Sequence, residues 1–207
     1  MLASFQLFGD HPALDLVNTL DDRFLVKGPI ERLGSYEDLL AFTRQSALLD
    51  SRRIAALSRQ GRASGKDQIL RDAWELRESL AAVLYAALGA ARKPSSQVIK
   101  TLERHFLNAV KHQQLIWHRQ PARSATLSHA TWEWGRFGTS LELPVWVLAQ
   151  SAASLLTSSA MDHVHMCASE TCRWLFLDSS KNHSRRWCNM KLCGNRMKVR
   201  RFQARQK

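Results

Sequence analysis

The chain has 207 residues, of which 45% are hydrophobic, so it is long enough for one or two domains with a sizeable core. Lys and Arg outnumber Asp and Glu by 30 to 18, which gives a formal net charge of +12 at pH 7. No apolar stretch reaches the roughly 18 residues that span a bilayer, and the first residues lack the basic and apolar regions of a secretory signal. These features argue against a membrane-spanning or exported protein and favour a soluble, cytoplasmic one.

The N-terminal segment, residues 5–19, is predicted to be extended, with a turn at Gly9–Pro12. Its residues 14–17 are mostly apolar and fit either a strand or the start of a helix. Asp15 and Asn18 stand among them, and two uses are open. They form a small polar site for an unknown small-molecule effector, or they cap a helix and satisfy nearby backbone groups, which is the commoner use of short polar side chains.

Two helices are predicted in the next part of the chain. Ser35 and Asp38 fit a capping box, in which a hydroxyl is followed three residues later by a carboxylate. Asp50 can cap a further short helix that ends at Leu57. The first helix is expected to bury Leu39, Leu40 and Phe42.

The longest periodic stretch of the chain is residues 66–92. Its apolar residues recur at steps of three and four, which is typical of one buried helical stripe. The next helix is predicted to begin with Ser95 or Ser96 as its cap. Its buried face is expected to consist of Leu102, Phe106 and Val110.

The character of the sequence changes at Gln114. Residues 115–117 and 131–134 are rich in aromatic and β-branched side chains and are predicted as antiparallel strands, with residues 125–127 as a third. Their tryptophans either offer stacking surfaces to a planar ligand or, more commonly for aromatic residues, pack the sheet on the helices. These are Trp117, Trp132 and Trp134. Pro144 can begin a last helix before the C-terminal segment. No flexible linker separates this helix from the C-terminal segment, so we expect the N-terminal and C-terminal parts of the chain to pack together.

All four cysteines lie in the last 41 residues, with the spacing C-x4-C-x15-C-x4-C. They are Cys167, Cys172, Cys188 and Cys193. Two close pairs can wrap one tetrahedral zinc ion, and four thiolates leave it no open position for a catalytic water. An iron–sulfur cluster also uses four thiolates, disulfides need an oxidising compartment, and His163, His165 or His183 could replace a cysteine. We expect one structural Zn²⁺ held by the four cysteines.

The same 41 residues carry eleven Lys or Arg and two acidic residues, a net charge of +9. Gly194 would turn the chain into a helix through Gln203, with cations on one face and with Val199 and Phe202 directed towards protein. A cationic stripe suits docking along phosphates, and Asn and Arg can contact base edges. The alternatives are a solvated tail, charge balance for the thiolates and, for Asn195, bracing of the zinc loop. The candidate nucleic-acid contacts are Arg185, Arg186, Lys191, Asn195, Arg196, Lys198, Arg200, Arg201 and Arg205.

The tetrapeptide Cys193-Gly-Asn-Arg196 and the residues before it closely resemble the CGNR zinc finger. The similarity covers the four spaced cysteines, the strand Trp-Leu-Phe-Leu-Asp at 174–178, the run Ser-Arg-Arg-Trp-Cys at 184–188 and the basic tail. This family places the finger after an N-terminal domain called ABATE, and residues 13–20, Ala-Leu-Asp-Leu-Val-Asn-Thr-Leu, look like the start of that domain.

Together these patterns predict a mainly α protein with a small antiparallel β-sheet, an α+β fold. Residues 1–160 would form a mostly helical ABATE-like domain, and residues 161–207 a treble-clef-like CGNR-type finger with a basic C-terminal helix. The resemblance implies a stress-linked transcriptional regulator of bacteria. Together with the basic helix it leads us to expect that the finger binds DNA, and that the N-terminal domain senses a ligand or forms a homodimer. The alternative is a zinc-stapled protein-interaction or dimerisation module without DNA binding. No catalytic motif is found, so we expect no enzyme activity.

Overall fold

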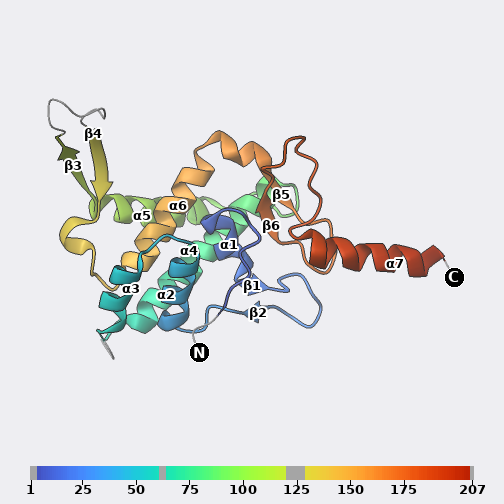
Figure 1. Cartoon of the computed structure of the whole chain (residues 1–207), viewed down its shortest axis with the longest axis horizontal. Helices are drawn as coiled ribbons and strands as arrows, with labels where there is room; N and C mark the ends of the chain where they lie inside the picture. The colour runs from blue at the N-terminus through green and yellow to red at the C-terminus, as the bar shows by residue number, and fades with distance from the viewer. Residues whose placement is uncertain (1–3, 61–63, 120–128, 206–207) are drawn as a thin grey trace.

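A central helix, α4 (Lys66–Ala87), runs through the middle of the body. The helices packed against it are α1 (Pro12–Asn18), α2 (Tyr36–Gln45), α5 (Ser96–Lys111) and α6 (Leu143–Leu156), while α3 (Ser51–Ser58) packs on α2. The computed structural model describes residues 4–60, 64–119 and 129–205. Figure 1 shows a β-hairpin projecting from one end of this body and the last helix projecting from the other. None of the helices in the described ranges combines the length and the apolar character needed to cross a bilayer.

The predicted starts of α2 and α3 are confirmed by their caps. The hydroxyl of Ser35 accepts a hydrogen bond from the N–H of Asp38 at 3.1 Å. The carboxylate of Asp50 likewise accepts one from the N–H of Arg53 at 2.8 Å. Both bonds satisfy N–H groups that the first turn of a helix otherwise leaves free, which is why these boundaries could be found locally.

On α5 the buried face differs from the predicted one. Leu102 and Ala109 are buried together with His105, whose Nε2 lies 3.1 Å from a carboxylate oxygen of Glu75 on α4. Val110 is 55% exposed, so the expectation that it is buried is wrong. Successive helical residues are rotated by about 100°, so Val110 points away once its neighbour Ala109 faces the body. The pattern of apolar residues did not indicate this buried face, because one of the residues on the face is a histidine.

Residues 12–18 form helix α1, so the extended segment predicted for residues 5–19 does not continue past residue 11. Of the two alternatives left open for residues 14–17, a strand or the start of a helix, the helix is the one that forms. The Nδ1 atom of His11 accepts a hydrogen bond from the N–H of Ala13 at 3.2 Å, and Pro12 occupies the first turn, where proline is favoured. The helix is buried against α4 and α6 of the body and against a strand of the finger. Its polar residues are therefore buried as well.

The two predicted strands form a hairpin of β3 (Gln114–His118) and β4 (His129–Glu133), with Leu115 opposite Trp132. The hairpin projects beyond the helices (Figure 1), and the expectation that it packs on them is wrong for two of the three tryptophans. Trp117 is 65% exposed and Trp132 is 57% exposed. Alternation along the strands places both indoles and Leu115 on one face, which no other described element covers.

The third tryptophan of this region does pack as predicted. Trp134 follows β4 and is buried, with its ring stacked on Trp146 of α6 at 6.1 Å between centroids. His112 stacks on the same indole at 3.8 Å. The hairpin is therefore anchored at its base alone. The third predicted strand, residues 125–127, lies outside the described residues.

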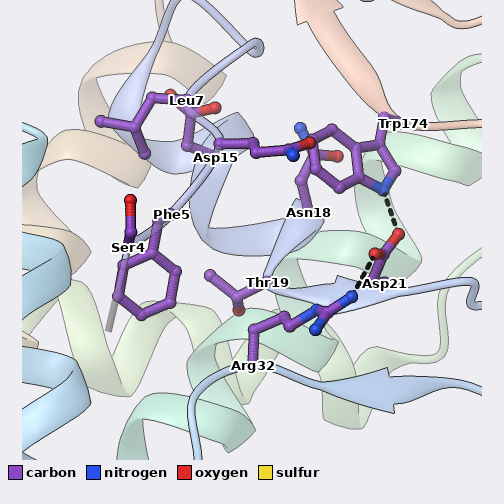
Figure 2. A pocket seen from close by; sticks show the side chains of 10 residues that line it. Ser4, Phe5, Leu7, Asp15, Asn18, Thr19, Asp21, Arg32 and Trp174 are labelled. Carbon is purple, nitrogen blue, oxygen red and sulfur yellow. Dashed lines mark hydrogen bonds and ion pairs between the residues drawn. The ribbon is translucent and has the colours of Figure 1, made fainter. Parts of the chain in front are cut away.

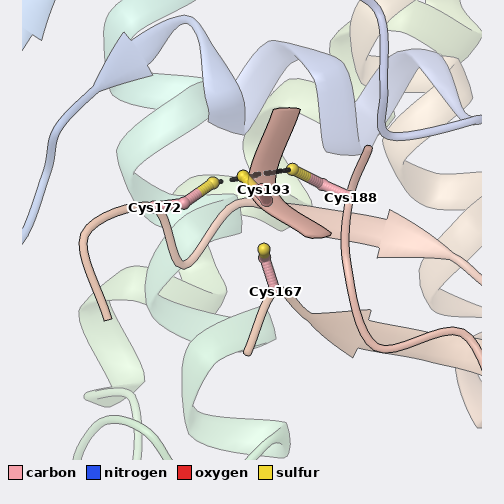
Figure 3. A group of neighbouring side chains, drawn as sticks. All are labelled: Cys167, Cys172, Cys188 and Cys193. Carbon is pink, nitrogen blue, oxygen red and sulfur yellow. Dashed lines mark hydrogen bonds between the residues drawn. The ribbon is translucent and has the colours of Figure 1, made fainter. Parts of the chain in front are cut away.

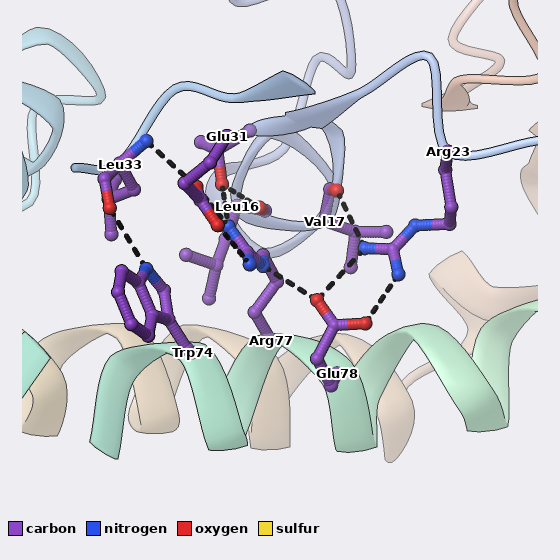
Figure 4. A network of polar contacts seen from close by, with 9 residues as sticks. Leu16, Val17, Arg23, Glu31, Leu33, Trp74, Arg77 and Glu78 are labelled. Atoms are coloured by element: carbon purple, nitrogen blue, oxygen red, sulfur yellow. Dashed lines mark hydrogen bonds and ion pairs between the residues drawn. The ribbon is translucent and has the colours of Figure 1, made fainter. Parts of the chain in front are cut away.

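A second hairpin, β1 (Leu20–Asp21) with β2 (Ile30–Glu31), is held on α4 by a network of charged side chains (Figure 4). Arg77 is 3% exposed, and its guanidinium donates two hydrogen bonds of 2.6 Å to the carboxylate of Glu31. It also donates one of 2.8 Å to Glu78. A buried guanidinium is tolerated only where such partners replace water, so the network fixes β1 and β2 over the central helix.

The C-terminal part begins after α6. A short 3-10 helix, η2 (Ser159–His163), leads into an antiparallel pair of strands, β5 (Val164–Met166) and β6 (Leu175–Leu177). A π-helical turn, η3 (Met190–Gly194), then continues directly into α7 (Asn195–Arg205). This order agrees with a treble-clef-like finger. The described residues form three two-stranded antiparallel sheets beside the helices, which confirms the predicted fold class.

Candidate metal centre and basic helix

The four cysteines meet at one point of the finger, although they come from separate segments (Figure 3). Their Sγ atoms, including that of Cys167, all lie within 4.8 Å of one another. Cys172 Sγ is 3.5 Å from Cys188 Sγ, which is 3.7 Å from Cys193 Sγ. In a tetrahedral site with Zn–S bonds of about 2.3 Å the sulfur atoms are about 3.8 Å apart. The donor set and the spacing fit one structural Zn²⁺, as predicted.

Two tight turns set the distance within each pair of cysteines. In the first, the N–H groups of Cys172 and Arg173 donate to the carbonyl of Ser169 at 2.9 and 3.1 Å. Arg173 takes a φ of 56°, which lets the chain reverse and return as β6. In the second, the N–H of Cys193 donates to the carbonyl of Asn189 at 2.9 Å. The sulfur positions thus follow from hydrogen bonds of the main chain.

A small apolar cluster surrounds the cysteines. Phe176 is fully buried, and Trp174 and Trp187 belong to the same cluster, as predicted for the core of the finger. Phe8 joins it from the N-terminal segment, with its ring centroid 6.2 Å from that of Trp174. The turn before α7 also passes close to this cluster. A Cβ atom at Gly194 would lie 3.3 Å from Cδ1 of Trp187, tighter than ordinary contact.

Without a cation the four thiols compete for charge. Hydrogen bonds with Cys172 and Cys188 lower the pKa of Cys167, while contacts with Cys167 raise the pKa of Cys172 and of Cys188, and burial raises that of Cys193. Four thiolates at this point therefore need a bound cation to balance them. Four thiolates on Zn²⁺ would carry an excess of negative charge. Helix α7 starts at Asn195, two residues after the last cysteine, so the positive end of its dipole lies beside that charge.

No histidine joins this group among the described residues. The ring of His163 stacks on that of His183 at 4.1 Å, and Nδ1 of His183 lies 3.0 Å from the carbonyl oxygen of Asp178. His165 stacks on Phe176 at 5.9 Å. These rings support the loop that carries the third cysteine, while the metal ligands remain the four thiolates.

Arg185 differs from the other predicted nucleic-acid contacts because its guanidinium is bound within the protein. It donates to the main-chain carbonyls of Phe8 and Cys188 and pairs with the carboxylate of Asp10. Its Cζ atom lies 4.5 Å from the centroid of the Phe176 ring. Arg185 therefore joins the zinc loop to the N-terminal segment, and few of its donors remain for a phosphate.

The other basic candidates of the finger lie at its surface. Helix α7 projects from the body (Figure 1), which exposes the candidates that it carries. Val199 is 55% and Phe202 is 63% exposed, so the expectation that both point towards protein is wrong for the described part of the chain. The side chains of Arg201 and Arg205 lie outside the described residues. The candidates that the structure places in solvent are Arg186, Lys191, Asn195, Arg196, Lys198 and Arg200.

Asp15 and Asn18 are both buried in α1, where they reach towards the finger. The amide of Asn18 exchanges two hydrogen bonds of 2.9 Å with the main chain of Leu175 in β6. The Oδ1 atom of Asp15 accepts one from the N–H of Gly9 at 2.7 Å. Burial raises the pKa of Asp15 to about 7, although the bond from Gly9 acts in the opposite direction. Asn18 is thus occupied with backbone groups, while Asp15 keeps one oxygen for another partner.

Two further contacts join the body and the finger, and no sequence pattern predicts them. The indole N–H of Trp174 donates to the carboxylate of Asp21 at 2.9 Å, and the hydroxyl of Tyr85 donates to the carbonyl of Arg173 at 3.1 Å. These partners are 153 and 88 residues apart, so no local pattern could link them. With these contacts the expected packing of the two parts is confirmed.

Comparison with known protein families gives two matches. Residues 10–159 match ABATE, described as "Putative stress-induced transcription regulator", and residues 163–206 match the CGNR zinc finger. The two matches follow one another in the order expected from the sequence and together cover most of the chain. No curated protein matches it.

Proposed function

We propose that this chain, which belongs to the ABATE family and ends in a CGNR zinc finger, is a transcriptional regulator that binds DNA through the finger and helix α7. The ABATE match spans well over half of the chain. In this proposal residues 161–207 contact DNA, and the body, residues 1–160, senses a ligand or forms a homodimer. Such a regulator of bacterial type would act in the cytoplasm, beside the chromosome.

The observation that carries the proposal is the position and charge of α7. The helix starts at the metal centre and projects from the body (Figure 1), and its eleven residues include five Lys or Arg and no acidic residue. Arg196, Lys198 and Arg200 are exposed. A helix of this width fits the major groove of DNA, and cations along it would release counterions from the phosphates.

The zinc ion supports this role by folding the finger. The four-thiolate shell is closed, which is the arrangement of structural zinc and leaves no position for an activated water. The apolar cluster of the finger is small, so metal binding would supply much of its folding free energy. DNA binding should therefore depend on the metal even though no zinc ligand touches DNA.

A second candidate function is favoured by the apolar side chains of the same helix. Val199 and Phe202 are exposed, and Leu192 in η3 is 44% exposed just before them. An apolar stripe flanked by cations suits an acidic protein surface, which would pair with the cations and cover the stripe. The finger would then be a protein-interaction or dimerisation module without DNA binding.

Removing positive charge from α7 distinguishes between the two candidate functions. A variant with Arg196→Gln, Lys198→Gln and Arg200→Gln should bind random duplex DNA roughly tenfold more weakly or worse, with a shallower salt dependence, because phosphate contacts are lost. Zinc content and helicity should stay at the wild-type level. The matched control changes three exposed lysines of the body to Gln and should keep wild-type affinity: Lys93, Lys100 and Lys111.

Equal DNA affinity of the α7 variant and the wild type would reject the proposed function. Loss of a dimer in the same variant, without any DNA binding of the wild type, would instead establish the interaction module. Both outcomes can be measured on one set of samples by fluorescence anisotropy and by light scattering.

A further inference from the structure

A small polar cavity lies where the body meets the finger (Figure 2). It has a volume of about 190 Å³. Its walls are residues 4–7 of the N-terminal segment, parts of α1 and β1, and Trp174 of the finger. A cavity of roughly 150 Å³ holds one benzene molecule, so this one can take a molecule of amino-acid size.

Asp15 supplies a buried carboxylate on one side of the cavity. The residue is 5% exposed, and its Oδ1 accepts the hydrogen bond from Gly9. No group in the described ranges donates to its other oxygen. Desolvation raises the pKa of Asp15 to about 7, because the charged form has lost water without gaining a cation. A protonated amine would supply both the missing charge and N–H donors.

Arg32 lies on the opposite side of the cavity in Figure 2. Its Nη2 donates to one carboxylate oxygen of Asp21 at 3.1 Å, and the other oxygen of Asp21 accepts from the indole of Trp174. Asp21 is therefore occupied, whereas Nε and Nη1 of Arg32 have no partner within the described part of the chain. A guanidinium with free donors is suited to bind a carboxylate.

We propose that this cavity is the effector site of the protein and that it binds a small zwitterion of amino-acid type, with its ammonium group on Asp15 and its carboxylate on Arg32. This inference rests on the proposed function, in which the body senses a ligand, and it specifies the site and the class of ligand. Opposite charges at the two ends discriminate against simple amines and simple carboxylic acids. A simple amine leaves the free N–H donors of Arg32 unused, and a simple carboxylic acid leaves the buried Asp15 without a cation.

Ligand binding at this site would be coupled to the finger through Trp174. This residue lines the cavity and stands two positions after the zinc ligand Cys172. The wall that it forms exists only while the finger is docked on the body, so ligand binding and docking must favour each other. The ligand would therefore stabilise the docked arrangement in which α7 is held at the end of the body.

Thermal unfolding in the absence of DNA tests this site on the full-length, zinc-loaded protein. The probes are glycine, β-alanine, γ-aminobutyrate and δ-aminovalerate, which differ only in the distance between amine and carboxylate, together with butylamine and butyrate. At millimolar concentration at least one of the amino acids should raise the Tm by a few degrees. Neither butylamine nor butyrate should match that shift.

Two variants and one control assign the effect to the cavity. Asp15→Asn keeps the acceptor for Gly9 but removes the charge, and Arg32→Gln removes the guanidinium; each should abolish the Tm shift. Asp22→Asn removes a carboxylate next to β1 that does not line this cavity, and it should respond like the wild type. Isothermal titration with the best probe measures binding directly, so it does not depend on the basal stability of each variant. It should show no binding to Asp15→Asn or Arg32→Gln and wild-type binding to Asp22→Asn.

The proposal is overturned if no amino acid of the series binds, if butylamine alone gives an equal shift, or if Asp15→Asn responds like the wild type. Because no DNA is present, such a failure leaves DNA binding by α7 untouched. Conversely, an α7 variant that fails to change DNA affinity does not alter the ligand response measured here.

Discussion

Asn18 and Leu175 are 157 residues apart in the chain and are joined by two hydrogen bonds of 2.9 Å. The Nδ2 atom of Asn18 donates to the carbonyl of Leu175, and its Oδ1 accepts from the N–H of the same residue. The side-chain amide thus takes the place of a neighbouring strand beside β6. Asn18 is 4% exposed, so water cannot replace it. This contact ties α1 of the body to the strand that follows the first cysteine turn.

Asn18→Ala should lower the free energy of unfolding by about 3 kcal/mol, because it leaves a buried N–H and a buried carbonyl without partners. Urea unfolding followed by circular dichroism measures the change. Asn108→Ala is the control, since this asparagine is exposed on α5 and should change stability by less than about 0.5 kcal/mol. A loss in Asn18→Ala no larger than in the control would contradict the strand-like role of the amide.

Neighbouring arginines of the finger should behave differently on substitution. Arg185→Gln removes bonds to main-chain carbonyls and to Asp10, so it should destabilise the protein by roughly 2 kcal/mol and speed zinc release to a chelator. Arg186→Gln changes an exposed side chain and should leave both quantities near wild type. If the two variants released zinc at the same rate, Arg185 would not be part of the zinc-loop support.

The charged network over α4 should contribute more than any ion pair at the surface. Arg77→Met keeps the apolar length of the side chain but removes the buried partner of Glu31. Glu78 keeps its pair with Arg23, so the cost should be roughly 2 kcal/mol. Arg53→Met breaks an exposed pair with Asp50 and should cost less than about 1 kcal/mol. The denaturation midpoints of the two variants are compared with that of the wild type. Equal shifts would show that the buried network contributes no more to stability than the surface ion pair.

The pH dependence of stability should carry the signature of Asp15. Burial raises the pKa of this carboxyl from its ordinary value of 3.8 to about 7 in the folded chain. Its contribution to stability is fully present below the unfolded value and is lost as the pH rises through about 7. Between pH 5 and pH 8 the wild type should lose roughly 2 kcal/mol through this group, and Asp15→Asn should not.

The control for that titration is Asp178→Asn. The side chain of Ser180 is the largest cause that lowers the pKa of Asp178 to about 2, and the hydrogen bonds that the Asp178 carboxylate accepts from the N–H groups of Ser180 and Arg185 act in the same direction. The group therefore titrates outside the window, and its substitution should lower stability without changing the slope between pH 5 and pH 8. If the free energy of unfolding of Asp15→Asn fell with pH as steeply as that of the wild type, the buried carboxyl would not be the cause of the pH dependence.

Local patterns predicted the parts of the fold that local chemistry decides. Caps such as Ser35 and Asp50 satisfy N–H groups within the same turn, so they can be recognised from a few residues. The cysteine spacing works in the same way, because each pair is closed by a turn of its own. The periodicity of α4 reflects one buried stripe and likewise needed no knowledge of its partners.

The errors concern side chains whose environment depends on distant parts of the chain. The sequence predicted aromatic strands correctly but could not show that their hairpin projects, which leaves Trp117 and Trp132 exposed. Apolar residues usually lie against protein, and the sequence predicts this for Val199 and Phe202, yet α7 projects into solvent. The contact of Asn18 with the finger could not be anticipated either, since its partner is a main-chain group that any residue would supply.

The most direct test of the account is binding of random duplex DNA across a salt series, with zinc-loaded protein and with protein stripped by a chelator. We predict that the loaded protein binds and that its log affinity falls linearly with log salt concentration, as phosphate contacts require. The stripped protein should lose this binding while the helices of the body persist in circular dichroism. Absence of binding by the loaded protein at low salt, or equal binding by both forms, would contradict the claim that a zinc-folded finger contacts DNA.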